Sequence, residues 1–148
     1  MNKELISLLS GELQKTEKAE KRLRASFEKA KLLINAKHDY TDDELEVIEG
    51  LTSRFARLSD ILISKIFRLL EKIDLDDSKT VRDSIILAEK KGLINSGEKF
   101  FRIRELRNFT AHEYEEEDLF ASISEIMELI PVLFDSVERI KIYSAKYI

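Results

Sequence analysis

One short segment, Arg104 to His112, gathers most of the side chains in this chain that could act on a phosphate group. Arg107 offers a planar pair of donors that suits phosphate oxygens, and Arg104 adds a second cation. Asn108 can orient a neighbouring group by hydrogen bonding. His112, with an ordinary pKa of about 6.5, can donate or accept a proton near neutral pH. These residue types together indicate a site for an anionic ligand.

We expect these residues to lie on one helix that begins after a cap at Ser96 and ends near His112. At about 100° per residue, Arg107 falls within the mostly apolar arc of this helix, and Asn108 and His112 extend a polar strip beside it. Because removing a guanidinium group from water costs several kcal/mol, Arg107 needs a compensating partner. The arc otherwise consists of Phe100, Ile103, Leu106, Thr110 and Ala111.

The sequence leaves two interpretations of Arg107 open. In the first, it forms a structural salt bridge with one of the 29 Asp and Glu residues, and His112 interacts with carbonyl groups at the helix end. In the second, the strip binds an anion such as a phosphate, with Arg104 and Arg107 as the cations.

Apolar residues at steps of three and four predict four further helices around this segment. We expect them at about 2–35, from Thr41 to Ile73, at about 79–91, and from the acidic run at 115–118 to beyond Ile140. The apolar stripes of the first two predicted helices are Leu5, Leu8, Leu9, Leu13, Ala19, Leu23, Phe27, Ala30 and Ile34, and Leu51, Phe55, Leu58, Leu62, Ile66, Leu69 and Ile73. The spacing favours an up-and-down bundle of four to five helices.

Local signals mark where these helices start, stop or bend. Thr41 and Glu44 have the spacing of a capping box, and Gly92 suits a left-handed cap after the third helix. Pro131 falls inside the last helix, where it removes one hydrogen bond and clashes with the preceding turn. We therefore expect a kinked last helix rather than two separate ones.

Composition points to the same fold class. The 148 residues include 43% hydrophobic and 36% charged side chains, with 4 Gly, 1 Pro and no Cys. So little Gly and Pro disfavours turn-rich β folds, and we expect one all-α domain over residues 1–148. The lack of Cys removes disulfides, thiolate nucleophiles and finger-type zinc sites, and a reducing cytoplasm is the expected location. Neither a signal peptide nor a membrane span is expected.

The net charge of −4 disfavours tight binding to duplex DNA through many phosphates. Charge alternates along the chain, about +4 over 1–38, −6 over 39–77, +4 over 78–107 and −6 over 108–148. This alternation could pair helices within the fold or leave a basic surface for an anionic partner. Motifs for P-loop, dinucleotide or metalloprotease chemistry are absent, and we expect no cofactor and no metal, including at His38 or the acidic run.

The segment Arg107 to Tyr114, with its R-x4-H-x-Y pattern, resembles the signature of the HEPN superfamily. Within it, the segment resembles HepT-like toxins that are paired with minimal nucleotidyltransferases. The order of helices also resembles that family, although the motif itself covers only these eight residues. The resemblance implies a metal-independent ribonuclease toxin whose site forms where two subunits meet, and hence a homodimer acting on RNA.

On this resemblance, Arg107, Asn108 and His112 are the catalytic residues and Arg104 contacts RNA or phosphate. His112 would act as base on the ribose 2′-hydroxyl or as acid to the departing 5′-oxygen, while Arg107 stabilises charge on the phosphate. Arg102 falls off the strip and is expected to be a solvated charge or, at most, an RNA contact. RNA cleavage of this kind leaves cyclic phosphate ends.

Tyr114 is implied to be the site where the partner nucleotidyltransferase adds a nucleotide and so silences the toxin. The simpler alternative is a Tyr that packs its ring at the edge of the cleft. Two further interpretations of the whole chain stay open. One is a non-catalytic nucleotide- or partner-binding subunit of a small nucleotidyltransferase, and the other is a helical dimerisation domain with no ligand.

Overall fold

Helices make up almost all of the computed structural model, which describes residues 2–34, 39–110 and 116–148, with side chains outside 116–120. The helices are α1 (Lys3–Leu33), α2 (Asp42–Asp60), α3 (Phe67–Ile73), α4 (Val81–Lys90), α5 (Gly97–Thr110) and α6 (Glu116–Ser144). A π-helical turn, η1 (Ile61–Ile66), joins α2 directly to α3, so these three elements form one long rod. Over the described ranges the chain is therefore an all-α bundle of five rods without strands, as the sequence predicts.

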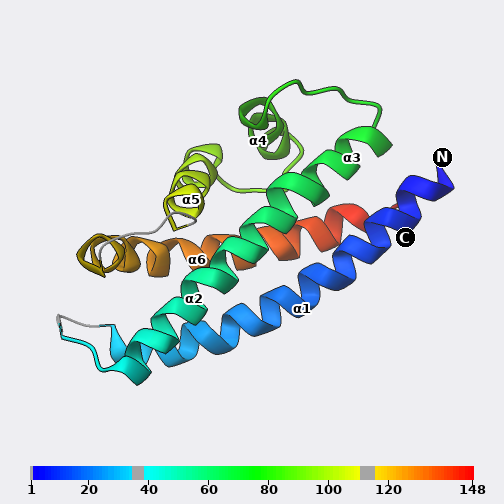
Figure 1. Cartoon of the computed structure of the whole chain (residues 1–148). Helices are drawn as coiled ribbons and strands as arrows, with labels where there is room; N and C mark the ends of the chain where they lie inside the picture. The colour runs from blue at the N-terminus through cyan, green and yellow to red at the C-terminus, as the bar shows by residue number, and fades with distance from the viewer. Residues whose placement is uncertain (1, 35–38, 111–115) are drawn as a thin grey trace.

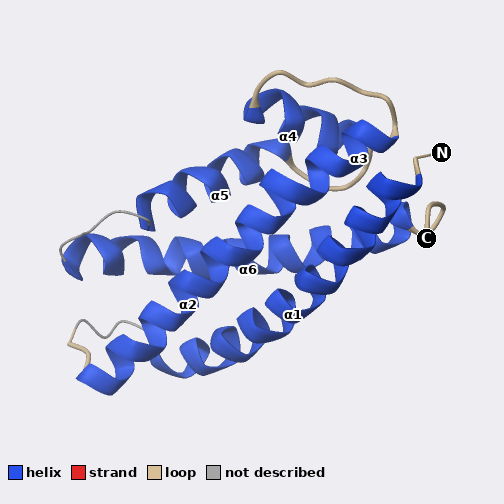
Figure 2. Ribbon diagram, turned by 45° about the vertical axis from the view of Figure 1, so that its right-hand side comes forward, coloured by secondary structure: helices blue, strands red, loops and turns tan. Residues whose placement is uncertain are grey.

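Figure 1 shows that α1 and the α2–η1–α3 rod run in opposite directions, and that α6 runs the same way as that rod. The α1 helix packs along α2, and α6 contacts α1, α2 and α5. The shorter α4 packs against α3, η1 and α5. Figure 2 shows the same arrangement after a turn of the molecule, with α5 lying beside α2 and the N- and C-termini close together at one end. The predicted all-α bundle of four to five helices is confirmed.

The core follows the predicted apolar stripes. Leu51, Phe55, Leu58, Leu62 and Ile66 of the α2–η1 rod are fully buried. They pack against buried residues of α1 and α6, which are Leu9, Ala19, Leu23, Phe27 and Ala30, and Ile123, Ile126, Ile130, Leu133, Val137 and Ile140. Burial of these side chains is the main source of stability for an amphipathic bundle.

Leu8 belongs to the predicted apolar stripe of α1 but does not join the core, because it is 52% exposed. Its neighbour Leu9 is fully buried, and consecutive residues of a helix point about 100° apart. The helix therefore cannot bury both at the same interface. Further along α1, Thr16 and Glu20 are buried instead, which the apolar pattern did not include.

The predicted start and stop signals are present. The Thr41 side chain accepts from the Glu44 N–H at 3.2 Å, and the Glu44 carboxylate accepts from the Thr41 N–H at 3.0 Å, which completes the capping box. Gly92 follows α4 with φ of +79°, the left-handed conformation expected there. Pro131 is exposed and lies inside α6, which continues to Ser144, so the last helix is one element.

Two helix ends share one turn geometry, although only one of them carries a Gly. After α4, the Leu93 N–H donates to the Ala88 carbonyl and the Gly92 N–H to that of Glu89. After α3, the Asp76 N–H donates to the Glu71 carbonyl, and Leu75 takes the position of the Gly with φ of +62°. These are the bonds of a Schellman motif, in which an L side chain at the left-handed position is strained.

None of the described helices combines the length and the apolar character that a membrane span needs.

Candidate functional site

The α5 helix positions the predicted strip through its two ends and its apolar face. At its start, the Ser96 hydroxyl accepts from the Lys99 N–H at 3.2 Å, and the carboxylate of Glu89 on α4 accepts from the Gly97 N–H. Its buried side chains are Phe100, Ile103 and Leu106. These contacts fix the rotation of α5 about its axis, and the polar side chains near its end are consequently set against α2 and η1.

Arg107 forms a bidentate ion pair with Asp60 of α2. The Arg107 Nε donates to Asp60 Oδ1 at 2.6 Å and its Nη2 donates to Oδ2 at 2.8 Å. The Arg107 side chain is 28% exposed and that of Asp60 is 45% exposed, so the pair lies at the surface of a groove rather than in the dry core. The hydrogen bond to Asp60 raises the pKa of Arg107, which stays a cation at any physiological pH. This contact is the salt bridge of the first interpretation, and it supplies the partner that Arg107 requires.

The π-helical turn η1 begins directly after Asp60. Its widened turn, closed by the Phe67 N–H donating to the Leu62 carbonyl, buries the consecutive residues 61–63. Asp60 and Ser64 on either side of that apolar run both face the groove. Short π-helical turns occur frequently at functional sites, because they alter the register of side chains along a helix.

The groove beside this pair has a volume of about 1190 Å³ and is open to solvent. It is formed by α1, α2, η1 and the end of α5, and Arg107 and Asn108 lie at the α5 side. Its lining residues are Glu12, Lys15, Thr52, Ser53, Ala56, Arg57, Asp60, Ile61, Ser64, Lys65, Arg107, Asn108 and Thr110. Most of these are polar, as expected for a surface that meets a hydrated ligand and not an apolar one.

Positive charge prevails around the groove once internal ion pairs are considered. Asp60 is paired with Arg107, and Glu12 is paired with Lys15 at 3.4 Å. The side chains of the exposed Arg57 and Lys65 form no ion pair or hydrogen bond with any residue that the structure describes. Such cations attract an anionic ligand more strongly than cations already neutralised by a carboxylate.

The structure brings three of the five predicted site residues together. Arg104, Arg107 and Asn108 line a smaller hollow of about 160 Å³. Asp60 and Ser64 also line this hollow. The predicted catalytic His112 and the predicted modification site Tyr114 lie outside the described residues. The proposed roles of all five stay predictions.

Arg102 is confirmed to lie off this strip. It forms a two-pronged contact with Glu125 of α6, its Nε and Nη2 each 2.6 Å from a carboxylate oxygen, and a further bond to Glu105 at 2.9 Å. Hydrogen bonds to Glu125 and Glu105 raise the pKa of Arg102. The sequence suggested a freely solvated charge. Instead, the guanidinium is engaged by Glu125 and Glu105 within the subunit.

Asp60 is the site residue that the sequence analysis missed. It precedes Arg107 by 47 positions and stands in a helix with several other acidic residues. The one available signal was position, because Asp60 interrupts the run of buried residues between Leu58 and Ile61. An acidic side chain at the margin of a core stripe indicates a specific partner.

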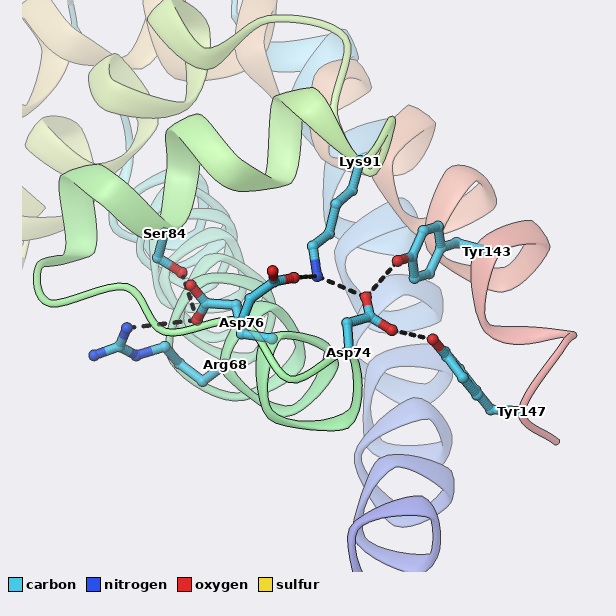
Figure 3. A network of polar contacts seen from close by, with 8 residues as sticks. Arg68, Asp74, Asp76, Ser84, Lys91, Tyr143 and Tyr147 are labelled. Atoms are coloured by element: carbon cyan, nitrogen blue, oxygen red, sulfur yellow. Dashed lines mark hydrogen bonds and ion pairs between the residues drawn. The ribbon is translucent and has the colours of Figure 1, made fainter. Parts of the chain in front are cut away.

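A second polar cluster lies at the opposite end of the bundle, where α3, α4 and α6 meet (Figure 3). Lys91 lies 2.6 Å from carboxylate oxygens of both Asp74 and Asp76. The hydroxyls of Tyr143 and Tyr147 donate to the two oxygens of Asp74. We call these five residues the terminal clasp, because they join the turn after α3 and the end of α4 to the last residues of the chain.

Glu71 extends the polar contacts of this end into the helix pair α3 and α4. Its Oε2 accepts from the Ser84 hydroxyl at 3.3 Å and from Arg68 Nη1 at 3.4 Å. Its Oε1 is buried without a hydrogen-bond partner among the described residues. Arg68 also donates to the carbonyl and hydroxyl of Ser78, so these contacts hold the loop before α4.

Within the ranges that the structure describes, no group of three or more His, Asp or Glu side chains is arranged to hold a metal ion. No family model matches the chain, and no curated protein matches it either.

Proposed function

We propose that this chain is the endoribonuclease toxin of a toxin–antitoxin module of the HEPN and minimal nucleotidyltransferase type. The observation that supports the proposal best is the cluster of Arg104, Arg107 and Asn108 at a polar groove, on the last described turns of α5. His112 follows within two residues of the end of that helix, so Arg107 and His112 are close enough along the chain to act on one phosphodiester.

The proposed reaction needs no metal. The ribose 2′-oxygen attacks the adjacent phosphorus, the bond from phosphorus to the 5′-oxygen breaks, and a 2′,3′-cyclic phosphate and a 5′-hydroxyl result. One His112 accepts the proton of the 2′-hydroxyl and another donates a proton to the departing 5′-oxygen. Arg107 stabilises the negative charge that builds up on the phosphate oxygens.

A homodimer supplies the two histidines that this reaction uses. Each subunit carries one motif and therefore one His112, so we propose that two copies of α5 face each other across the substrate. The partner enzyme, a minimal nucleotidyltransferase, would silence the toxin by adding a nucleotide to Tyr114. We place this activity in the cytoplasm, where RNA and nucleoside triphosphates are available.

One observation favours the alternative, a non-catalytic subunit that binds a nucleotide or the nucleotidyltransferase itself. Asp60 already occupies two donor nitrogens of Arg107, which is what a purely structural pair requires. In that case the groove would bind its ligand without cutting it.

Cleavage of a purified RNA by the full-length protein in excess EDTA tests the proposal. We expect Arg107→Ala to lower the rate by about 10²–10³ and His112→Ala by about 10²–10⁴, with cyclic phosphate on the products of the native protein. Arg102→Ala is the matched control, because it removes an arginine of the same helix whose partners are Glu125 and Glu105. It should leave the rate unchanged.

Two results would contradict the proposal. One is native protein that leaves RNA intact while it forms a stable complex with a nucleotidyltransferase, as the alternative requires. The other is a strictly monomeric protein by sedimentation at micromolar concentration, since a monomer carries only one His112.

A further inference from the structure

We infer that the groove between α1, α2, η1 and α5 is a track for a phosphodiester backbone, with Arg57 and Lys65 as its phosphate contacts. The inference rests on the proposed function in one respect, the choice of RNA as the polyanion. The binding site itself is inferred from charge, shape and the chemistry of the lining residues.

The charge of the groove favours a ligand with several negative groups. The acids that line it are each engaged, Glu12 by Lys15 and Asp60 by Arg107. The exposed Arg57 and Lys65 have no partner within the described residues. Each such cation that neutralises a phosphate releases counterions from the nucleic acid, and this release drives binding.

The groove is also long enough for several nucleotides. Its lining on the α2–η1 rod extends from Thr52 to Lys65, which at 1.5 Å per residue is roughly 20 Å. Arg107 borders both the groove and the smaller hollow that contains Arg104. A backbone lying along the rod would therefore pass Arg57 and Lys65 and reach the two arginines of α5.

The remaining lining residues contact sugar and phosphate better than bases. Hydroxyl and amide groups come from Thr52, Ser53, Ser64 and Asn108. Among the described residues that line the groove, none is aromatic. Proteins that bind the bases of single strands stack them on aromatic side chains, so this groove should bind RNA with little dependence on base identity.

Binding of a labelled single-stranded oligoribonucleotide with 2′-fluoro riboses, which cannot be cut, tests the inference on the full-length protein. We expect Arg57→Gln and Lys65→Gln each to weaken binding roughly threefold to tenfold, and each to reduce the salt slope of the binding constant by about 0.7. Lys90→Gln is the control, because Lys90 is exposed and lines a different hollow on α4. Oligo-A and oligo-U should bind within about threefold of each other.

Three results would overturn the inference. The first is native affinity in both variants, and the second is a preference of tenfold or more for one base, which would mean that bases are recognised. The third is displacement of the oligonucleotide by polyglutamate at equal charge, which would identify an acidic protein as the ligand.

Cleavage assays with ordinary RNA separate this inference from the proposed function. If the native protein cuts RNA, Arg57→Gln and Lys65→Gln should raise KM and leave kcat unchanged, because neither residue touches the reacting atoms. If it does not cut RNA, the catalytic proposal fails, while loss of oligonucleotide binding in the two variants still supports the track.

Discussion

The carboxylate of Asp60 engages two donor nitrogens of Arg107 and leaves the third, Nη1, without a hydrogen bond among the described residues. A guanidinium group that is bound along one edge by a carboxylate has a fixed plane, and its remaining N–H donors point in a fixed direction. Under the proposed function, Asp60 would be a positioning residue, because it would let Arg107 meet a phosphate without first losing rotational freedom.

Replacing Asp60 with Asn keeps the shape of the side chain and removes its charge. We expect kcat for RNA cleavage to fall roughly tenfold with KM changed less, because Arg107 loses its fixed orientation. The unfolding free energy should fall by at most about 1 kcal/mol, since the ion pair is partly exposed. Steady-state kinetics and urea unfolding measure both quantities.

Asp60→Glu provides the control for this prediction. It restores the carboxylate beside an open groove, and it should recover most of the lost kcat. Full activity in Asp60→Asn would show that the pair only stabilises the fold.

Modification of Tyr114 is the prediction that concerns regulation. Co-expression with the cognate nucleotidyltransferase should add nucleotide-sized mass to the chain, and Tyr114→Phe should remove that increment while cleavage persists. A nucleotide there would place negative charge near Arg104 and Arg107 and so compete with RNA. Intact-mass spectrometry gives the result, and an unmodified, stable complex of the two proteins would point to the binding-subunit alternative.

The strained turn after α3 predicts a stabilising substitution. Leu75 has φ of +62° and a side chain that is 93% exposed, so it loses little packing when removed. We expect Leu75→Gly to raise the unfolding free energy by about 0.5–1 kcal/mol. Denaturant unfolding measures the change.

Gly92 supplies the matched comparison for Leu75, because it holds the same position after α4. A Cβ added there would meet no atom within 4 Å, so only its φ of +79° opposes substitution. Gly92→Ala should lower the unfolding free energy by about 1 kcal/mol. Equal effects of the two substitutions in the same direction would refute this explanation of the turns.

The terminal clasp predicts losses of stability at both extremes of pH. Burial acts to raise the pKa of Asp74, but hydrogen bonds from Lys91, Tyr143 and Tyr147 outweigh it and leave the pKa below its ordinary value. A lowered carboxyl pKa gives stability that is present above about pH 4 and is lost as the pH falls further.

At alkaline pH, ionisation of the two tyrosines of the terminal clasp determines the expected loss of stability. The hydrogen bond to Asp74, with burial, raises the pKa of Tyr147 to about 12, and burial with the same carboxylate raises the pKa of Tyr143 as well. A raised pKa gives stability that is present below about pH 10 and is lost toward pH 12. Unfolding midpoints should fall over that range, and fall less in Tyr147→Phe. An identical pH profile in that variant would exclude Tyr147 as the cause.

The fold was predictable because its signals are local and repeated. The stripe from Leu51 to Ile66 and the capping box at Thr41 depend only on residues a few positions apart, and both are present in the structure. The π-helical turn was not predictable, since η1 packs against α1 and α4, which are distant from it along the chain. A pattern of apolar residues does not contain that three-dimensional constraint.

The site was predictable only in part. The helical spacing of Arg104, Arg107 and Asn108 places them on adjoining positions of α5, and the structure gathers them at one hollow. The partner of Arg107 comes from a distant segment, and many acids in the sequence were equally eligible. The turn after α4 was predictable because Gly is the residue that commonly adopts a left-handed conformation. The left-handed conformation of Leu75 after α3 has no such signal in the sequence.

The placement of the two chain ends has a practical consequence for attaching other molecules. Both termini lie at one end of the bundle, away from the end where α5 leads toward α6 (Figures 1 and 2). A fluorescent protein or a surface linker fused to the N-terminus would stand clear of that end. The C-terminus is a poorer choice, because Tyr147 is tied to Asp74 one residue before the chain ends. Immobilisation through the N-terminus therefore leaves the contact between Tyr147 and Asp74 undisturbed during measurements of binding.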